Sequence, residues 1–371
     1  MLDIPSIDFL DPINTKIIEL QDLRTKVIPY STPTVAFVQL HSLFQIIESL
    51  ASARIEGNHT TIADYVQDKI EGKNTSQPHK EISNIEACVK LIDHEFNVNQ
   101  EFKVSEFFIK QLHGVLTKDL LLEGSKEPGA YRNHNVSITQ SKHTPSDFIK
   151  VPELMKSLFE FINRDDPLQA DLLKVAIAHH YFVWVHPFDN GNGRMARLLT
   201  YIMLKQYGFF KVLFINPAAI FCENRNLYIE YLEKADTGTD ENIKEWCDYV
   251  LSGLLKEHKK IRKLLDKNFL DTKIILPAIQ YSVNNKLISE EENFVLRCSV
   301  SKDDYIIMLK DLKEILKDKS DSQLTYLIHK MLDNHLLRKE SDRKYTINLN
   351  AYNLIRGMFE SLVNEKLVEF K

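Results

Sequence analysis

The sequence predicts a mainly α-helical protein, and two observations support this. Apolar side chains recur at the i, i+3, i+4 spacing of amphipathic helices over residues 35–56, 168–185 and 195–208. Only 11 of the 371 residues are glycine, while 44% are hydrophobic, which is enough to bury one large core or two smaller ones.

The helix predicted over residues 35–56 is expected to stop at Gly57. Ser52 and Glu56 lie four residues apart near its end, so they share one face. Taken alone, this pattern is better explained by a solvated glutamate that precedes a helix end.

The stretch HPFDNGNGRMAR, residues 186–197, lies between the two later helices and offers an anion site. A helix that begins after a glycine-rich turn presents unpaired N–H groups and a positive dipole end, which bind phosphate. Arg194 and Arg197 lie three residues apart on one face of the first turn, and arginine is costly there unless an anion binds. His186, across the loop, is a candidate proton acceptor near neutral pH. Together these residues indicate transfer of a phosphate-containing group to a hydroxyl. The alternative is a helix cap beside a turn histidine.

This stretch resembles the active-site loop of the Fic family, H-x-F-x-[D/E]-G-N-G-R-x-x-R. The resemblance implies a Fic-fold helical core and transfer of AMP from ATP to Tyr, Ser or Thr hydroxyls of a target protein and of the enzyme itself. His186 would deprotonate the hydroxyl and Phe188 would anchor the loop. The phosphates would be held by Asn190, Gly191, Asn192, Gly193, Arg194 and Arg197.

The chain departs from the family pattern at position 190, where Asn190 replaces the acidic residue that coordinates Mg²⁺. An amide oxygen can bind Mg²⁺ but lacks the charge that a hard cation prefers. Either Asn190 binds the metal weakly, or Asp189 replaces it, or catalysis is impaired.

Three further segments extend the resemblance. Ser52-x-x-x-Glu56-Gly57 is similar to the inhibitory motif of class II Fic proteins, which implies that Glu56 pairs with Arg197 where the γ-phosphate would bind. Val136-Ser137-Ile138 has the alternation of a short strand and would belong to a β-hairpin flap that holds the target backbone. The segment from Asn224 to Ile229 resembles a stretch of Fic proteins that borders the adenine of ATP. Tyr228 and Ile229 would lie next to this adenine. A core position for Tyr228 is an equally good interpretation.

We expect three parts: a helical N-terminal region with the inhibitory motif (1–105), a Fic catalytic core (106–262) and a C-terminal domain (263–371). In the last part, a helix from Ser322 to Leu337, then a turn between two short strands up to Ile347, resembles a winged helix-turn-helix. Residues 301–345 hold ten basic and nine acidic residues, so contact with protein or dimerisation is favoured over DNA binding.

Net charge and cysteine usage restrict the class further. A net charge of −5 and a pI near 6.2 argue against a protein that coats nucleic acid. The four cysteines lack metal or redox spacing, so we expect buried free thiols. The first residues lack signal-peptide features and no apolar run approaches membrane-spanning length, so we expect a cytoplasmic protein without membrane contact. His179 and His180 are expected to pack rather than to bind a ligand.

Two classes of function stay open at this point. The first is a self-inhibited protein adenylyltransferase that uses ATP and Mg²⁺. The second is a nucleotide-sensing regulator whose winged helix binds DNA or a partner. His186 favours the first, because a sensor needs no base. Transfer of UMP or GMP is a third alternative.

Overall fold

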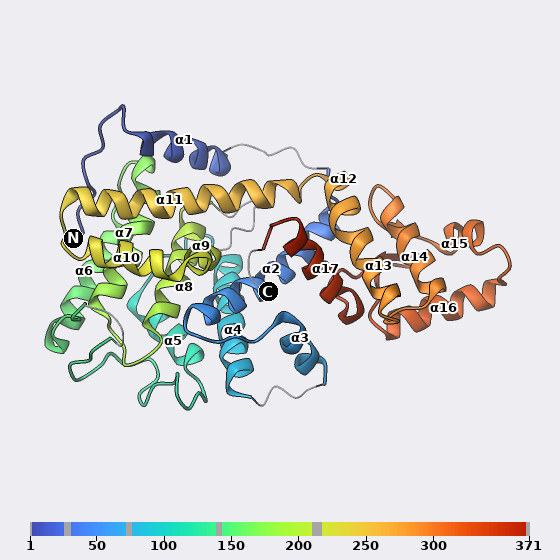
Figure 1. Ribbon diagram of the computed structural model, residues 1–371, viewed down its shortest axis with the longest axis horizontal. Coiled ribbons are helices and arrows are strands. Elements are labelled where there is room, and N and C mark those ends of the chain that lie inside the picture. Colours follow the sequence, from blue (N-terminus) through green and yellow to red (C-terminus); the bar gives the residue numbers. More distant parts are fainter. Residues whose placement is uncertain (1, 26–30, 72–75, 139–142, 210–216, 369–371) are drawn as a thin grey trace. The chain divides into compact units, whose positions relative to one another are not determined.

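The structure, a computed structural model, describes residues 2–25, 31–71, 76–138, 143–209 and 217–368. These residues are mainly helical, which confirms the predicted fold class (Figure 1). They form two compact units. The first comprises Met1–Ile28, Ile47–Thr60 and Asn74–Lys259, and the second comprises Pro29–Ile46, Thr61–Lys73 and Lys260–Lys371. The three-part division at residues 105 and 262 stays a prediction, because both units draw on N-terminal segments.

The first unit is a bundle of helices. It contains α1 (Pro12–Thr25), the end of α2 (Thr34–Ile55), α4 (Gln77–Val98), α5 (Glu106–Leu116), η1 (Phe148–Lys150), α6 (Val151–Asn163), η2 (Leu168–Ala170), α7 (Asp171–Val185), α8 (Asn192–Gln206), α9 (Pro217–Glu223), α10 (Arg225–Ala235) and most of α11 (Asp240–Lys263).

The centre of this bundle is α7, which packs against α6 and α8. Every residue of α7 from Asp171 to Phe182 is buried, so the helix is enclosed on all sides instead of presenting one apolar face. Trp246 of α11 donates its indole N–H to the Ala176 carbonyl at 2.7 Å. Because α7 is fixed along its length, its C-terminal end is a rigid platform for the residues that follow.

The next helix, α8, begins after Gly191, whose φ of +77° is a left-handed conformation that glycine adopts without strain. It ends two residues before Gly208, which has a φ of +81° and donates its N–H to Lys205 O. The predicted glycine signals at both ends of this helix therefore coincide with its boundaries.

Helix α2 spans Thr34–Ile55, within one residue of the prediction, and Gly57 follows with a φ of +96°. Contrary to the sequence expectation, this helix is long and apolar enough to cross a membrane by length and composition alone. Its polar residues are nevertheless bonded inside the protein: Glu48 accepts the Ala218 N–H at 3.1 Å and Gln39 donates to Ile347 O at 3.0 Å. In the structure α2 is thus a core helix, since these buried polar groups have protein partners.

The second unit combines helices with a small sheet. It contains α3 (Ile62–Glu71), α12 (Lys267–Phe269), η3 (Leu270–Ile275), α13 (Leu276–Asn284), α14 (Glu290–Ser301), β1 (Ile306–Ile307), α15 (Leu309–Ile315), α16 (Asp321–Asp333), β2 (Leu337–Ser341), β3 (Lys344–Ile347) and α17 (Tyr352–Asn364). The strands are antiparallel in the order β1-β3-β2.

The helix and hairpin predicted in this unit are present, but α16 ends at Asp333, four residues before the predicted Leu337, which instead begins β2. Ser320, not Ser322, caps α16, because its hydroxyl accepts the Gln323 N–H and Gln323 bonds back to the Ser320 N–H. The hairpin β2–β3 follows α16 as the winged-helix prediction requires. The winged-helix assignment itself stays a prediction.

All four cysteines are free thiols, as expected. Cys88, Cys247 and Cys298 are buried, whereas Cys222 is half-buried.

Candidate functional site

His186 ends α7 in a left-handed conformation, with φ +52° and ψ +62°. Its Nδ1 lies 3.2 Å from the Val183 carbonyl, which can only accept, so Nδ1 carries the ring proton and Nε2 is the acceptor. Burial lowers the pKa of His186 to about 4. The imidazole is therefore neutral at pH 7 and can accept a proton at Nε2.

Asn192 holds the loop that follows. Its side-chain oxygen accepts the Phe188 N–H at 2.9 Å and its amide donates to the Phe188 carbonyl at 2.8 Å. The fully buried Phe188 ring stacks on His113 of α5, with centroids 3.7 Å apart. The Asn192 side chain is thus engaged by the loop itself.

His113 is a loop-holding residue that sequence reasoning missed. Its Nδ1 accepts the Gly129 N–H at 2.9 Å, so its Nε2 carries the proton that it donates to the Asn190 carbonyl at 3.1 Å. Burial lowers the pKa of His113 to about 4, which keeps this arrangement at neutral pH. A lone histidine among the apolar residues of α5 gives no signal of this role.

The two predicted metal ligands differ in what they offer a cation. The exposed Asn190 donates its side-chain amide to the Gly124 carbonyl at 2.7 Å. Asp189 has a buried carboxylate oxygen, Oδ1, with no hydrogen-bond partner among the described residues. No group of three or more metal-ligating side chains occurs in the described part of the chain. A carboxylate oxygen suits Mg²⁺ better than an amide does, so Asp189 fits the metal better than Asn190.

Arg197 of α8 is fully buried and is held by both residues of the predicted inhibitory motif. One terminal nitrogen, Nη2, lies 2.5 Å from Glu56 Oε1 and 3.0 Å from the Ser52 carbonyl, while Nε donates to Ser52 Oγ at 2.9 Å. Burial alone raises the pKa of Glu56, but Arg197 and the nearby Arg194 and Arg225 outweigh it and lower the pKa below its usual 4.5. The pair is therefore ionic at neutral pH.

Glu56 also lies against the first turn of α8. A Cβ atom at Gly193 would be 2.5 Å from Glu56 Oε1, so only glycine admits the carboxylate there. The N-terminus of a helix attracts anions through its free N–H groups and dipole. Glu56 thus occupies the position that the sequence assigned to a phosphate.

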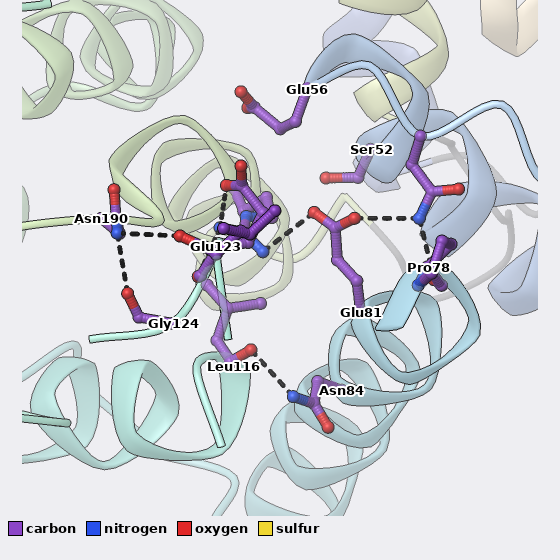
Figure 2. Close-up of polar contacts among 12 residues, drawn as sticks. Ser52, Glu56, Pro78, Glu81, Asn84, Leu116, Glu123, Gly124 and Asn190 are labelled. Atoms are coloured by element: carbon purple, nitrogen blue, oxygen red, sulfur yellow. Dashed lines mark hydrogen bonds and ion pairs between the residues drawn. The ribbon is translucent and has the colours of Figure 1, made fainter. Parts of the chain in front are cut away.

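Arg194, also fully buried, is held between two other carboxylates. These are Glu81 and Glu123, both labelled in Figure 2. The Nη1 of Arg194 lies 2.9 Å from Glu81 Oε1 of α4, and its Nη2 lies 3.0 Å from both Glu123 Oε2 and the Glu123 carbonyl. Asn58, two residues after Glu56, donates to the second oxygen of Glu81 at 2.9 Å. Sequence reasoning singled out none of these three partners, because more than 70 residues separate each from Arg194.

Arg225 at the start of α10 is a further contact to the end of α2. Its Nε donates to the Ile55 carbonyl at 2.8 Å, one of the groups that a helix C-terminus leaves unpaired. The residue belongs to the Asn224–Ile229 stretch but had no predicted role.

A pocket of about 790 Å³, including its open mouth, adjoins these groups. Tyr228 is buried and bonded to His179 at 2.9 Å, so it is both a core residue and a pocket wall. His179 and His180 are buried, as expected. The lining residues are Ile55, Glu56, Ile138, His143, Val183, Trp184, His186, Gly193, Arg197, Arg225, Tyr228, Ile229, Leu232, Glu233 and Asp236.

The predicted strand Val136-Ser137-Ile138 is not formed: these residues belong to no sheet in the described part of the chain. Ile138 nevertheless lines the pocket. Residues 139–142, where the predicted hairpin would turn, lie outside the described residues. The flap stays a prediction.

Fold and site together define a helical protein in which the half-buried His186 and the buried Arg197 line one pocket beside a helix N-terminus. Residues 103–204 match the Fic/DOC family. The matched segment contains both His186 and Arg197, so this part of the chain is similar to the Fic/DOC family.

Part of the chain is also similar to named proteins. The chain is 28% identical over 193 residues to the protein adenylyltransferase Fic of Nematostella vectensis, covering 50% of this chain and 42% of that protein. It is 30% identical over 119 residues to a probable protein adenylyltransferase of Aquifex aeolicus, covering 32% of this chain and 34% of that protein. The chain thus spans less than half the length of these relatives.

A Fic family protein from Desulfovibrio desulfuricans shares the fold with a TM-score of 0.55 at 18% identity, covering 93% of this chain and 98% of that one. A Fic domain-containing signalling protein from Bacteroides thetaiotaomicron gives a TM-score of 0.55 at 20% identity, covering 67% of this chain and 96% of the other.

Proposed function

We propose that this protein transfers AMP from ATP to Tyr, Ser or Thr hydroxyls of a target protein and of itself, and that Glu56 holds this activity in check. One observation carries the proposal: the unprotonated Nε2 of His186 belongs to a residue that lines the same pocket as Gly193 and Arg197. A base and an anion site side by side are what nucleotidyl transfer to a hydroxyl needs. The names of the adenylyltransferase relatives support AMP as the group transferred.

The reaction needs one proton transfer and one displacement. His186 Nε2 accepts the proton of the target hydroxyl, and the freed oxygen forms a bond to the α-phosphorus of ATP. The bond from the α-phosphorus to the oxygen bridging to the β-phosphate breaks, and pyrophosphate leaves with that electron pair. The first turn of α8 and Arg197 stabilise the negative charge on the phosphates.

The adenine of ATP would lie in the pocket against Tyr228 and Ile229. Mg²⁺ would supply further charge neutralisation on the phosphates, and Asp189 would hold it.

Inhibition follows from competition for one guanidinium. The Glu56 carboxylate is tethered 2.5 Å from Arg197 and lies against Gly193, so a γ-phosphate cannot take the same place. ATP then binds with its α-phosphate out of line with the hydroxyl.

The test is protein labelling with ATP carrying the label on the α-phosphate, with γ-labelled ATP as the control for phosphorylation. Glu56→Gly should raise self-labelling and target labelling well above the unaltered protein, and adding His186→Ala should abolish it, because the hydroxyl is a weak nucleophile without a base. Glu101→Gly, an exposed glutamate in a turn, is the matched control.

Equal labelling by the unaltered protein and Glu56→Gly would overturn the inhibitory role. Label arriving only from γ-labelled ATP would overturn AMP transfer.

A further inference from the structure

The C-terminal end of α7, where His186 lies, is capped by side chains. A helix leaves its last four carbonyls without intrahelical partners. Here each of the carbonyls from Val183 to His186 accepts a side-chain donor. His186 Nδ1 donates to Val183 O at 3.2 Å, and His143 Nε2 donates to Trp184 O at 2.9 Å. Val185 O accepts two donors, Ser146 Oγ at 3.1 Å and Arg132 Nη2 at 3.2 Å. Arg132 also donates from Nε to His186 O at 2.7 Å.

Among these donors, His143 has a distinctive pairing. Its Nε2 lies 2.9 Å from the Trp184 carbonyl, and its Nδ1 lies 2.9 Å from Oδ2 of Asp236, the residue that caps α10. A carbonyl and a carboxylate only accept, so both ring nitrogens must carry protons for both bonds to form. His143 with both bonds made is therefore a cation, and its side chain is only 8% exposed.

The charged groups around His143 come from two helices. Asp236 and Glu233 lie on the α10 side, and His186 and His180 belong to α7, with His180 Nε2 bonded to Oδ1 of the same Asp236 at 2.9 Å. Burial lowers the pKa of His143, but its bonds to Asp236 and Trp184 and the charge of Glu233 outweigh this and raise it above its usual 6.5. His143 and His180 lower the pKa of Asp236, so this carboxylate stays ionised.

We infer that His143 is a positioning residue: as an imidazolium bridging Asp236 and the end of α7, it holds His186 in the orientation that directs Nε2 into the pocket. The inference rests on the proposed function. His186 needs such support because a left-handed conformation is unfavourable for a residue with a side chain. A cation is also the favourable charge at a helix C-terminus.

His186 and His143 then limit the activity at opposite ends of the pH range. His186 works in its neutral form, above a pKa of about 4. His143 works in its charged form, so activity falls as the pH rises through the raised pKa of His143. The expected profile is a bell whose alkaline limb belongs to a residue that never touches the substrate.

The experiment measures kcat/KM against pH for AMP transfer in the Glu56→Gly protein, with and without His143→Gln. Glutamine can keep one bond but not the charge. We expect a fall of about ten- to hundredfold at the optimum and loss of the alkaline limb, with KM for ATP little changed, since misplacement of the base slows chemistry. His94→Gln, an exposed histidine on α4, is the matched control and should leave rate and profile unaltered.

A second measurement follows the titration of His143 directly, and its main readout uses the unaltered protein. In an NMR titration of the full chain with labelled histidine, the His143 signal should change above pH 6.5 and move when Asp236→Asn removes the carboxylate. Titration of His143 at or below 6.5, or a His143→Gln profile that keeps its alkaline limb, overturns the inference. Absence of AMP transfer from the Glu56→Gly protein at every pH instead overturns the proposed function, and the NMR result stands apart from it.

Discussion

Arg194 and Arg197 lie three residues apart on one helix face, and both are buried against carboxylates rather than phosphates. Arg197 pairs with Glu56, while Arg194 pairs with Glu81 and Glu123. Removing Glu56 therefore frees only one of the two arginines. Of the two carboxylates on Arg194, Glu123 is the more exposed, at 49% of its side chain, so a phosphate displaces it at lower cost.

This difference gives a prediction for Glu123. In the Glu56→Gly protein, adding Glu123→Gln should lower KM for ATP about three- to tenfold, because a neutral amide competes less well than a carboxylate with a phosphate for Arg194. The measurement is the initial rate of AMP transfer over a series of ATP concentrations. Glu127→Gln, exposed in the same loop, is the control. An unaltered KM would mean that Arg194 does not contact ATP.

At the scale of elements, α2 acts as a helix that docks its C-terminal turn into the site. Arg197 donates to the Ser52 carbonyl and Arg225 donates to the Ile55 carbonyl. The site therefore binds the backbone of α2 as well as the side chain of Glu56. One turn further back, the buried Glu48 accepts the Ala218 N–H. Burial raises the pKa of Glu48 to about 8. The helix therefore packs with this carboxyl protonated at neutral pH.

The raised pKa makes stability depend on pH in a defined direction. The unfolded chain ionises Glu48 near pH 4.5, while the folded protein must keep its proton up to about pH 8, so the contribution of Glu48 is complete below 4.5 and is lost as pH rises to 8. Glu48→Gln mimics the protonated form and escapes this loss. Its Tm should exceed that of the unaltered protein by a margin that grows by several degrees from pH 5 to pH 8.

Thermal unfolding at four pH values measures this margin, with Glu101→Gln at an exposed turn as the control. Parallel curves for the two proteins would show that Glu48 titrates near its usual value.

At the scale of the whole molecule, the second unit contains a hairpin, β2–β3, that follows α16, as in a winged-helix domain that binds nucleic acid. The residues from 301 to 345 nevertheless carry ten basic and nine acidic side chains. Affinity for DNA comes largely from neutralising phosphates with excess positive charge. The near balance here favours a protein partner or a second copy of the chain.

We therefore expect no saturable binding of a labelled DNA duplex below about 10 µM protein at 150 mM salt, as for a domain that neutralises few phosphates. Fluorescence anisotropy at 50 and 150 mM salt measures this. Saturable binding with a steep salt dependence would contradict the charge argument and favour the regulator hypothesis.

The sequence by itself determined the features encoded in local spacing. Helix periodicity and glycine signals predicted the ends of α2 to within one residue and those of α8 to within three, and the motif from His186 to Arg197 predicted a candidate base and anion site, because each depends on residues a few positions apart. Only the tertiary structure brought Glu81 and Glu123 to Arg194, Asn58 to Glu81, and His143 and Asp236 to the end of α7. These contacts join residues from about 20 to more than 110 positions apart, and which carboxylate meets which buried cation is decided by how the helices pack. Patterns of residues a few positions apart therefore do not predict which carboxylate pairs with which buried cation.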